Sequence, residues 1–361
     1  MKQGWKTCKF ADVFDLQMGK TPSRDNPTYW GDDNMWVSIA DMNEQKYMSA
    51  TKEGITDVAV QESGIKPIPK GTVIMSFKLS IGKVSIATSK LYTNEAIMGF
   101  IEKEEGTLVP EYLYYYLKGY KWEGANKAAM GMTLNKKTIA ENTISYPPIA
   151  EQEKIVAELD CLSEIIEKKK QQLKELDNLA QSIFYEMFGD PVENDKGWET
   201  KKVIDVVKLQ RGYDLPIQYR QSDGGIPVWG SNGIVGWHNE AKVDYGVITG
   251  RSGTLGTVYS YDKPFFPLNT TLFSVDTHGN DIVYLKCLLN IFDLKRFGTG
   301  TGVPTLNRNV FHSEPIISVP LALQQDFASK IESIEKQKEL ITQSIKETET
   351  LFNSRMDYYF N

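Results

Sequence analysis

Two stretches of the chain, residues 149–190 and 321–361, carry apolar residues at alternating steps of four and three positions. This spacing is that of the a and d positions of a heptad repeat, which form one apolar seam along a helix. Pro148 and Pro320 stand just before the stretches and Gly189 follows the first, as at helix ends. The pattern predicts two helices of roughly 40 residues. The predicted helix-pairing seam comprises Ile155, Leu159, Leu162, Ile166, Leu173, Leu176 and Ile183 in the first, and Phe327, Ile331, Ile334, Ile341, Ile345 and Phe352 in the second.

Two such seams in one chain favour pairing of the helices with each other. Polar interruptions at Lys169 and Lys338 fall at different places in the two copies, which favours pairing within the chain over self-association. Two separate amphipathic helices, each packed on its own domain, are the alternative.

The segments outside these helices have a different pattern. Short runs typical of β-strands, such as 71–77, 83–87 and 246–249, are separated by Gly, Pro, Asn and Asp turns. A short helix is expected at 110–117. The pattern predicts an α+β domain before each long helix.

The chain also repeats itself. Gly4-Trp5 is answered by Gly197-Trp198 at an offset of 193 residues, and Leu134-Asn135 by Leu306-Asn307 at an offset of 172. The sequence that leads into each helix repeats as well, as Pro-Ile-Ala-x-Gln and Pro-Leu-Ala-x-Gln. A two-fold duplication is therefore predicted, with segments 1–148, 149–190, 191–320 and 321–361. The copies differ most between Gly19 and Gly71.

Composition and charge narrow the class of protein. The 361 residues are 41% hydrophobic and 24% charged, which predicts a globular protein with two cores. No apolar run is long enough to span a membrane, and neither a membrane span nor a signal peptide is expected. The three cysteines, Cys8, Cys161 and Cys287, are far apart, so a cytoplasmic protein with reduced thiols is expected. The net charge of −6 lies mostly in 149–190, which carries −5.

Sequence motifs for catalysis are weak. Gly19-Lys20-Thr21 resembles the end of a phosphate-binding loop, but Phe14 stands where that motif needs a glycine. Tyr146-Pro147-Pro148 lacks the amide or carboxylate of the corresponding methyltransferase loop. The three histidines, His238, His278 and His312, have no metal-ligand spacing. We expect no catalytic residues, no metal and no cofactor in this chain.

Loops rich in glycine and basic residues occur at corresponding places in both copies. Lysine and arginine bind DNA phosphates, while arginine, asparagine, serine and threonine read base edges. The predicted DNA-binding residues are Lys20, Thr21, Arg24, Lys78, Ser80, Lys83, Asn135, Lys136 and Lys137 in the first copy, and Arg211, Tyr213, Arg251, Ser252, Thr254, Thr299, Thr301, Asn307 and Arg308 in the second.

The order of globular domain, long helix, globular domain and long helix resembles the DNA-specificity (S) subunit of type I restriction-modification enzymes. The Gly-Trp start of each copy, the Leu-Asn pair and the repeated Pro-x-Ala-x-Gln pattern before the helices support this resemblance, which covers essentially the whole chain.

The resemblance implies an α+β fold in which two similar target recognition domains, 1–148 and 191–320, are separated by two long antiparallel coiled-coil helices. Each domain would read one half of a bipartite double-stranded DNA sequence. The helices would set the gap between the half-sites and bind two modification subunits. Those partners would carry S-adenosylmethionine, and restriction subunits would add ATP- and Mg-dependent translocation and cleavage, so this chain would be non-catalytic.

Three other functions remain open from the residues. One is an S-like subunit of a methylation-only or other phage-defence system. Another is a non-catalytic coiled-coil spacer that carries two protein- or sugar-binding domains. The third is a hydrolase whose carboxylates come together from separate segments.

Overall fold

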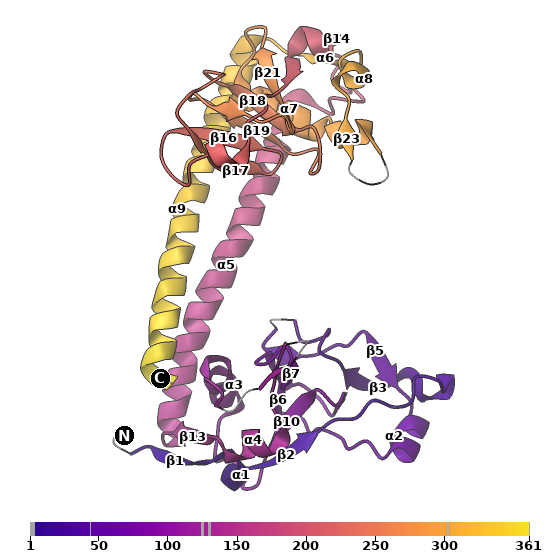
Figure 1. The fold of residues 1–361 in the computed structure, drawn as a ribbon, viewed down its shortest axis with the longest axis vertical. Coiled ribbons are helices and arrows are strands. Elements are labelled where there is room, and N and C mark those ends of the chain that lie inside the picture. Colours follow the sequence, from indigo (N-terminus) through magenta and orange to yellow (C-terminus); the bar gives the residue numbers. More distant parts are fainter. Residues whose placement is uncertain are drawn as a thin grey trace. The chain divides into compact units, whose positions relative to one another are not determined.

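The computed structural model describes residues 4–360 except 44, 124, 125, 129, 130, 301 and 303. The chain forms two compact units (Figure 1). Unit 1 contains the chain up to Lys168 together with the segment from Ile345 onward, and unit 2 is Lys169–Ser344. Each unit therefore joins one globular region to parts of both long helices.

Unit 1 is an α+β domain built on a five-stranded sheet in the order β2-β10-β6-β8-β4. Smaller sheets have the orders β1-β13, β5-β3-β9 and β11-β12-β7. Its strands are β1 (Lys6–Lys9), β2 (Phe14–Met18), β3 (Trp30–Val37), β4 (Tyr47–Met48), β5 (Glu53–Ile55), β6 (Val73–Ser76), β7 (Lys78–Leu79), β8 (Val84–Ala87), β9 (Tyr92–Thr93), β10 (Ile97–Glu102), β11 (Asn126–Ala128), β12 (Gly131–Thr133) and β13 (Thr143–Tyr146). Its short helices are α1 (Phe10–Val13), η1 (Pro27–Tyr29), α2 (Asp57–Ser63), α3 (Pro110–Gly119) and α4 (Lys136–Glu141).

Unit 2 has the same design, with a four-stranded sheet in the order β15-β21-β18-β19. Smaller sheets have the orders β14-β24, β17-β16-β20 and β22-β23. Its strands are β14 (Glu199–Lys202), β15 (Lys208–Arg211), β16 (Ile226–Gly230), β17 (Gly233–His238), β18 (Gly246–Gly250), β19 (Val258–Tyr261), β20 (Phe266–Pro267), β21 (Thr271–Asp276), β22 (Gly298–Thr299), β23 (Thr305–Leu306) and β24 (Pro315–Ser318). Its short helices are α6 (Val203–Val206), η2 (Ile217–Tyr219), α7 (Ile282–Ile291), η3 (Leu294–Phe297) and α8 (Arg308–Phe311).

The predicted duplication is present in the topology. The sheet pairs β1-β13 and β14-β24 correspond, as do the central sheets and the parallel pairs β3-β9 and β16-β20. Gly19 and Gly212 occupy equivalent positions, where a side chain would collide with Thr93 O and Leu268 O respectively. Strand β4 and helix α2 lie between Gly19 and Gly71 of unit 1, the stretch in which the copies diverge most.

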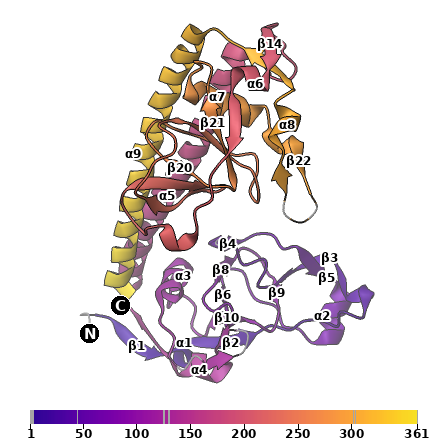
Figure 2. The ribbon, with the colours of Figure 1, turned by 45° about the horizontal axis from the view of Figure 1, so that its top comes forward.

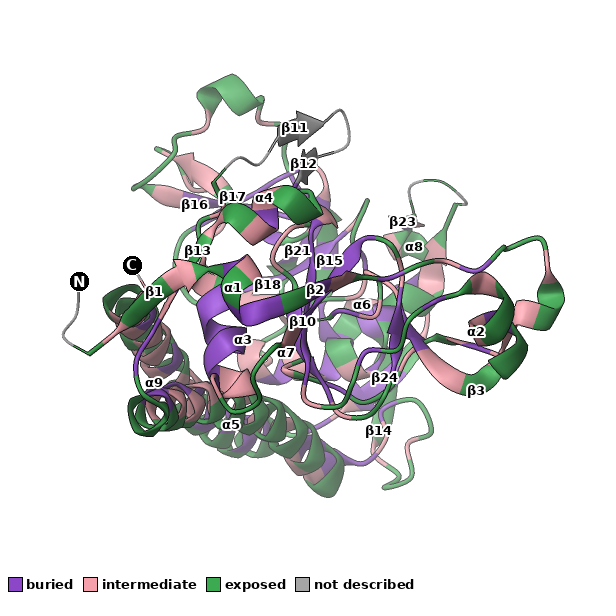
Figure 3. Cartoon of the chain, turned by 90° about the horizontal axis from the view of Figure 1, so that it is seen from below, coloured by how far each residue is buried: buried purple, intermediate pink, exposed green. Residues whose placement is uncertain are grey.

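The two long helices are α5 (Ile149–Phe188) and α9 (Leu321–Phe360). Unit 1 contains the start of α5 and the end of α9, and unit 2 contains the end of α5 and the start of α9. Their outward positions are exposed, as the green faces in Figure 3 show. The predicted seam residues are all buried or half-buried: Ile155, Leu159, Ile166, Phe327, Ile331, Ile334 and Ile345 are buried, and Leu162, Leu173, Leu176, Ile183, Ile341 and Phe352 are half-buried.

Polar residues also join the helices within each unit. In unit 2, Lys338 Nζ lies 2.8 Å from an oxygen of Asp177, and Lys169 donates to Ser344 Oγ over 2.6 Å. In unit 1, the Arg355 guanidinium donates to Glu158 on the other helix. The lysines that interrupt the two seams therefore have polar partners across the helix pair.

Aromatic side chains at the helix ends complete both cores. Phe184 and Phe188, at the end of α5, are fully buried, and their rings lie 5.6 and 5.3 Å from that of Phe327 in α9. The corresponding residues of α9, 172 positions later, are Met356 and Phe360, and the Phe360 ring lies 5.5 Å from that of Tyr112. The seam prediction did not include these four residues.

A buried glutamine fixes the start of each long helix. Gln324 Nε2 donates to Val319 O and to Asn280 Oδ1, both at 2.7 Å, and its Oε1 accepts from Asp281 N at 2.9 Å. Gln152 makes the equivalent bonds, donating to Pro147 O and accepting from Val109 N. Each glutamine therefore ties the first turn of a long helix to the N-terminus of α3 or α7.

Replacement of Gln324 by alanine tests this contact. Because the substitution removes the partner of the half-buried Asp281 amide and that of the buried Val319 carbonyl, we expect Gln324→Ala to lower the free energy of unfolding by about 2 kcal/mol. Urea denaturation measures the change, with the exposed neighbour Gln325→Ala as the matched control. Equal stability of the two variants would contradict the proposed role of Gln324.

Candidate nucleic-acid interface

Residues from all the predicted loops of the second copy line one surface hollow of unit 2. Figure 2 shows two of its elements, β22 and α8, beside each other. The residues that line it come from β15, β21, the turn after β18, the β22–β23 hairpin and α8: Arg211, Arg251, Leu272, Thr299, Thr305, Leu306, Asn307, Arg308 and Asn309. The predicted residues Arg211, Arg251, Thr299, Asn307 and Arg308 are therefore brought together.

Backbone hydrogen bonds hold Arg251 in the lining of this hollow. Its N–H donates to Thr270 O and its carbonyl accepts from Leu306 N, both at 2.8 Å. Gly250, just before it, must be a glycine because a Cβ there would lie 1.8 Å from Thr254 O. The tight turn after β18 therefore fixes where the Arg251 side chain starts.

The hollow is lined by three arginines and by no carboxylate among the described residues. Arg211 lies 3.4 Å from Asp214, which is outside the lining, and the Arg251 guanidinium donates to Asn269 O over a long distance of 3.5 Å. Burial, together with the nearby charges of Arg308 and Lys208, lowers the pKa of His312. A positive surface of this kind suits a polyanion.

The other predicted residues of the second copy have varied surroundings. Asn307 caps α8 by accepting from Asn309 N at 3.1 Å, and Thr299 Oγ1 donates to Thr305 O. The Tyr213 ring lies 5.9 Å from that of Phe273. Ser252 is half-buried and Thr254 is exposed. Thr301 lies outside the described residues.

The equivalent place in unit 1 has different side chains. Phe77 N donates to Ala96 O and Phe77 O accepts from Leu134 N, both at 2.9 Å, so Phe77 stands where Arg251 stands in unit 2. Met18 pairs with β10 as Arg211 pairs with β21. Lys136 follows the helix cap Asn135 as Arg308 follows Asn307.

Arg24, a predicted contact of the first copy, is part of a local ion pair. Its NH1 and NH2 donate to the two carboxylate oxygens of Glu53, at 2.7 and 2.8 Å. Its guanidinium also lies 3.7 Å from the centroid of the Trp30 ring. The hydrogen bonds from Arg24 lower the pKa of Glu53.

Most remaining predicted residues of unit 1 also have partners within the chain. Lys20 Nζ donates to Ser63 O, Thr21 Oγ1 to Glu95, and Lys83 Nζ to Ile39 O. The other four are placed as follows: Asn135 accepts from Thr138 N, Lys137 lies 3.9 Å from Glu141, Ser80 is exposed and Lys78 is half-buried.

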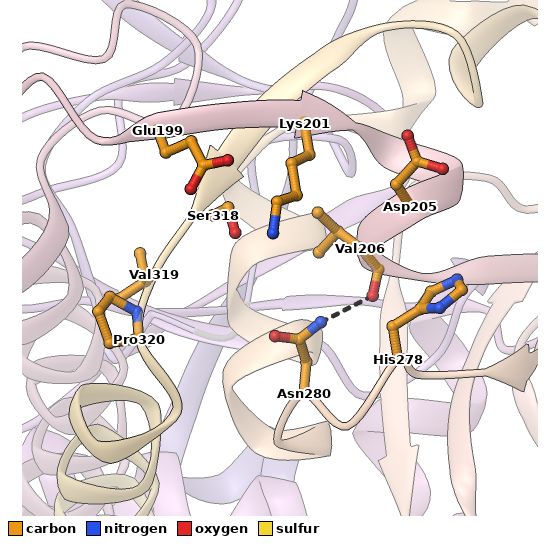
Figure 4. Close-up of a pocket in the computed structure, with 9 residues that line it drawn as sticks. All are labelled: Glu199, Lys201, Asp205, Val206, His278, Asn280, Ser318, Val319 and Pro320. Atoms are coloured by element: carbon orange, nitrogen blue, oxygen red, sulfur yellow. Dashed lines mark hydrogen bonds between the residues drawn. The ribbon is translucent and has the colours of Figure 1, made fainter.

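A second hollow of unit 2 belongs to the scaffold (Figure 4). It is lined partly by the carboxylates of Glu199 and Asp205, which do not suit a phosphate. Asn280 points across it and donates to Val206 O at 2.9 Å, while its own oxygen accepts from Gln324. These bonds connect α6 and the start of α9 through one side chain.

The described residues contain no helix that is long and apolar enough to cross a membrane. Within the same residues, no three His, Cys, Asp or Glu side chains are grouped as metal ligands.

Comparison with known proteins identifies the family. The family model of the type I restriction modification DNA specificity domain matches residues 2–178 and again residues 195–350. The chain therefore belongs to the family of type I restriction-modification DNA specificity domains, with two copies of the domain.

Individual relatives agree with this assignment. The specificity subunit of the type I restriction enzyme MjaIX from Methanocaldococcus jannaschii is 33% identical over 233 residues, which are 59% of this chain and 54% of that protein. The HindI specificity subunit from Haemophilus influenzae is 28% identical over 178 residues, or 46% of this chain and 38% of that one. The matches thus span about half or less of the length of these relatives.

Solved structures share the fold. The S subunit of a type I restriction-modification system from M. genitalium aligns over 98% of this chain and 95% of its own, with a TM-score of 0.60 and 15% identity. A chain from a structure on complex assembly and conformational transition of the type I R-M system gives a TM-score of 0.63, at 15% identity, over 100% of this chain and 98% of that one.

The ion pair of Arg24 leads to a pH-dependent prediction. Because the folded-state pKa of Glu53 is lowered, the pair stabilises the fold above the unfolded-state pKa of Glu53 and loses this effect as the pH falls through the folded-state value. Both side chains are about half exposed. We therefore expect Arg24→Met to lower the free energy of unfolding by about 1 kcal/mol or less at pH 7, and by a smaller amount in acid.

Urea denaturation at neutral and acidic pH measures the free energy of unfolding of the wild type and of Arg24→Met. The control is the same substitution in a Glu53→Gln background. If Arg24→Met lowered the free energy of unfolding equally at both pH values, the loss would instead be assigned to stacking of Arg24 on Trp30.

Proposed function

We propose that this chain is the sequence-specific DNA-binding specificity subunit of a type I restriction-modification complex. The observation that carries the proposal is the hollow of unit 2, where three arginines from β15, the turn after β18 and α8 come together with no carboxylate among the described lining residues. The presence of two copies of the specificity domain supports recognition of a bipartite double-stranded target, one half by each copy.

In this proposal the chain directs catalysis and performs none. Modification subunits with S-adenosylmethionine methylate the DNA, and restriction subunits with ATP and Mg²⁺ cleave it. Large apolar residues on the outer faces of the long helices support docking of protein partners: Leu340 is 69% exposed, and Leu179 and Leu351 are about half exposed. The cytoplasm, where these partners and the DNA are found, is the expected location.

Two alternatives make different predictions. An S-like subunit of a methylation-only or other phage-defence system would bind DNA in the same way without a restriction partner. A coiled-coil spacer with two protein- or sugar-binding domains would not bind DNA. The three arginines favour a DNA-binding subunit over the spacer.

Salt dependence of binding tests the proposed function. In a complex of the full chain with its modification subunits, phosphate contacts release counterions, so we expect affinity for target DNA to fall about a thousand-fold between 50 and 200 mM salt. Fluorescence anisotropy with a labelled duplex that contains the target measures this change. A complex that assembles but binds no duplex at low salt would contradict the proposed function and favour the spacer.

A further inference from the structure

Arginine is distributed unequally between the two globular regions. Residues 1–148 contain one arginine, Arg24, whereas residues 191–320 contain five. Three of those five, Arg211, Arg251 and Arg308, line the hollow of unit 2. Arg24 is paired in a bidentate manner with Glu53, and the described positions of unit 1 that correspond to these three arginines carry other residues.

Equivalent backbone positions therefore present different chemistry in the two units. Arg211 corresponds to Met18, whose side chain is 47% exposed, and Arg251 corresponds to the buried Phe77. Arg308 corresponds to the exposed Lys136. The fold holds the same positions in both units, while the hydrogen-bonding groups at them differ.

The chemistry of these side chains favours different bases. A guanidinium can donate two parallel hydrogen bonds to O6 and N7 of guanine, which is the most common specific contact in the major groove. A methionine side chain has no donor, and apolar side chains contact the thymine methyl group. A lysine carries a compact charge that binds phosphate well but lacks the planar fork of arginine.

The position of Arg251 also favours base reading over a phosphate contact alone. Its N–H and its carbonyl are both hydrogen-bonded, and Arg251 is a half-buried residue in the lining of the hollow. Asn307, Asn309 and Thr299 line the same hollow and add groups that can read base edges. A phosphate requires only an exposed cation, as Lys136 already provides in unit 1.

We propose that the hollow formed by Arg211, Arg251 and Arg308 reads guanine in one half of the DNA target, and that the equivalent surface around Met18 does not. This inference rests on the proposed function, since it concerns the base preference of the same interface. It predicts a target with unequal halves, of which the half bound by unit 2 contains guanine.

Selection from random duplexes tests the inference. The full chain in complex with its modification subunits is used to select bound DNA, which is then sequenced. We expect a bipartite motif with guanine in one half. Arg251→Gln should weaken binding to this motif about 10- to 100-fold and relax one guanine position, with the other half unchanged. Arg211→Gln and Arg308→Gln should relax positions in the same half.

The matched control is Arg296→Gln. Arg296 is an exposed arginine of the same unit that lies over the rings of Phe292 and Phe297 rather than in the hollow. Its replacement removes the same charge and should leave the selected motif unchanged. Thermal melting of each variant complex checks that the arginine variants remain folded.

A reciprocal variant examines unit 1. Met18→Arg places a guanidinium at the position equivalent to Arg211, and we expect it to add a guanine preference to the other half of the motif. No change in that half would contradict the equivalence of the two surfaces.

The outcomes separate this inference from the proposed function. If the wild-type complex selects no motif, the proposed function fails. If it selects a bipartite motif but Arg251→Gln weakens binding equally for all sequences, the arginines bind phosphate and the guanine inference alone is overturned. The guanine inference would also be overturned if the three arginine variants changed the base preference in different halves of the motif.

Discussion

The cores of both units depend on one kind of contact, in which the end of one long helix packs beside the start of the other. Phe184 and Phe188 of α5 complete the core of unit 2 with Phe327 of α9, and Phe360 of α9 packs on Tyr112 in unit 1. Burial of each such aromatic side chain contributes about 2 kcal/mol. Because each globular region needs a helix end from the other copy, neither copy can be cut out at its own boundaries without loss of core residues.

The same contact supports the candidate DNA interface. Gln324 ties the start of α9 to the N-terminus of α7, and Asn290 near the other end of α7 exchanges two hydrogen bonds with the backbone of Val258 in β19. The central sheet is thereby fixed to the helix pair. Arg211 ends its strand β15, and Arg251 follows its strand β18. The scaffold is thus repeated in both units while the loop side chains differ, which is what recognition of two different half-sites requires.

Much of this arrangement could be predicted from the sequence, because helix seams and repeats are local or periodic signals. The heptad pattern located α5 and α9, and the repeated Gly-Trp and Pro-x-Ala-x-Gln segments indicated the duplication. The buried Phe184 and Phe188 were missed because a seam pattern describes only the face toward the other helix, whereas these side chains also face a globular core. The ion pair of Arg24 with Glu53 depends on two segments that only the fold brings together. The equivalence of Phe77 and Arg251 agrees with the repeat of Gly82 and Gly256 at the same offset of 174 residues, and the backbone hydrogen bonds establish it.

The central claim is that this chain selects the DNA sequence on which partner enzymes act. Sequencing of methylated bases in the native genome, with and without this gene, tests it most directly. The account predicts that a bipartite methylated-adenine motif with a fixed gap disappears on deletion and returns when the gene is restored. Unchanged methylation in cells shown to express the chain together with its modification subunits would contradict the claim.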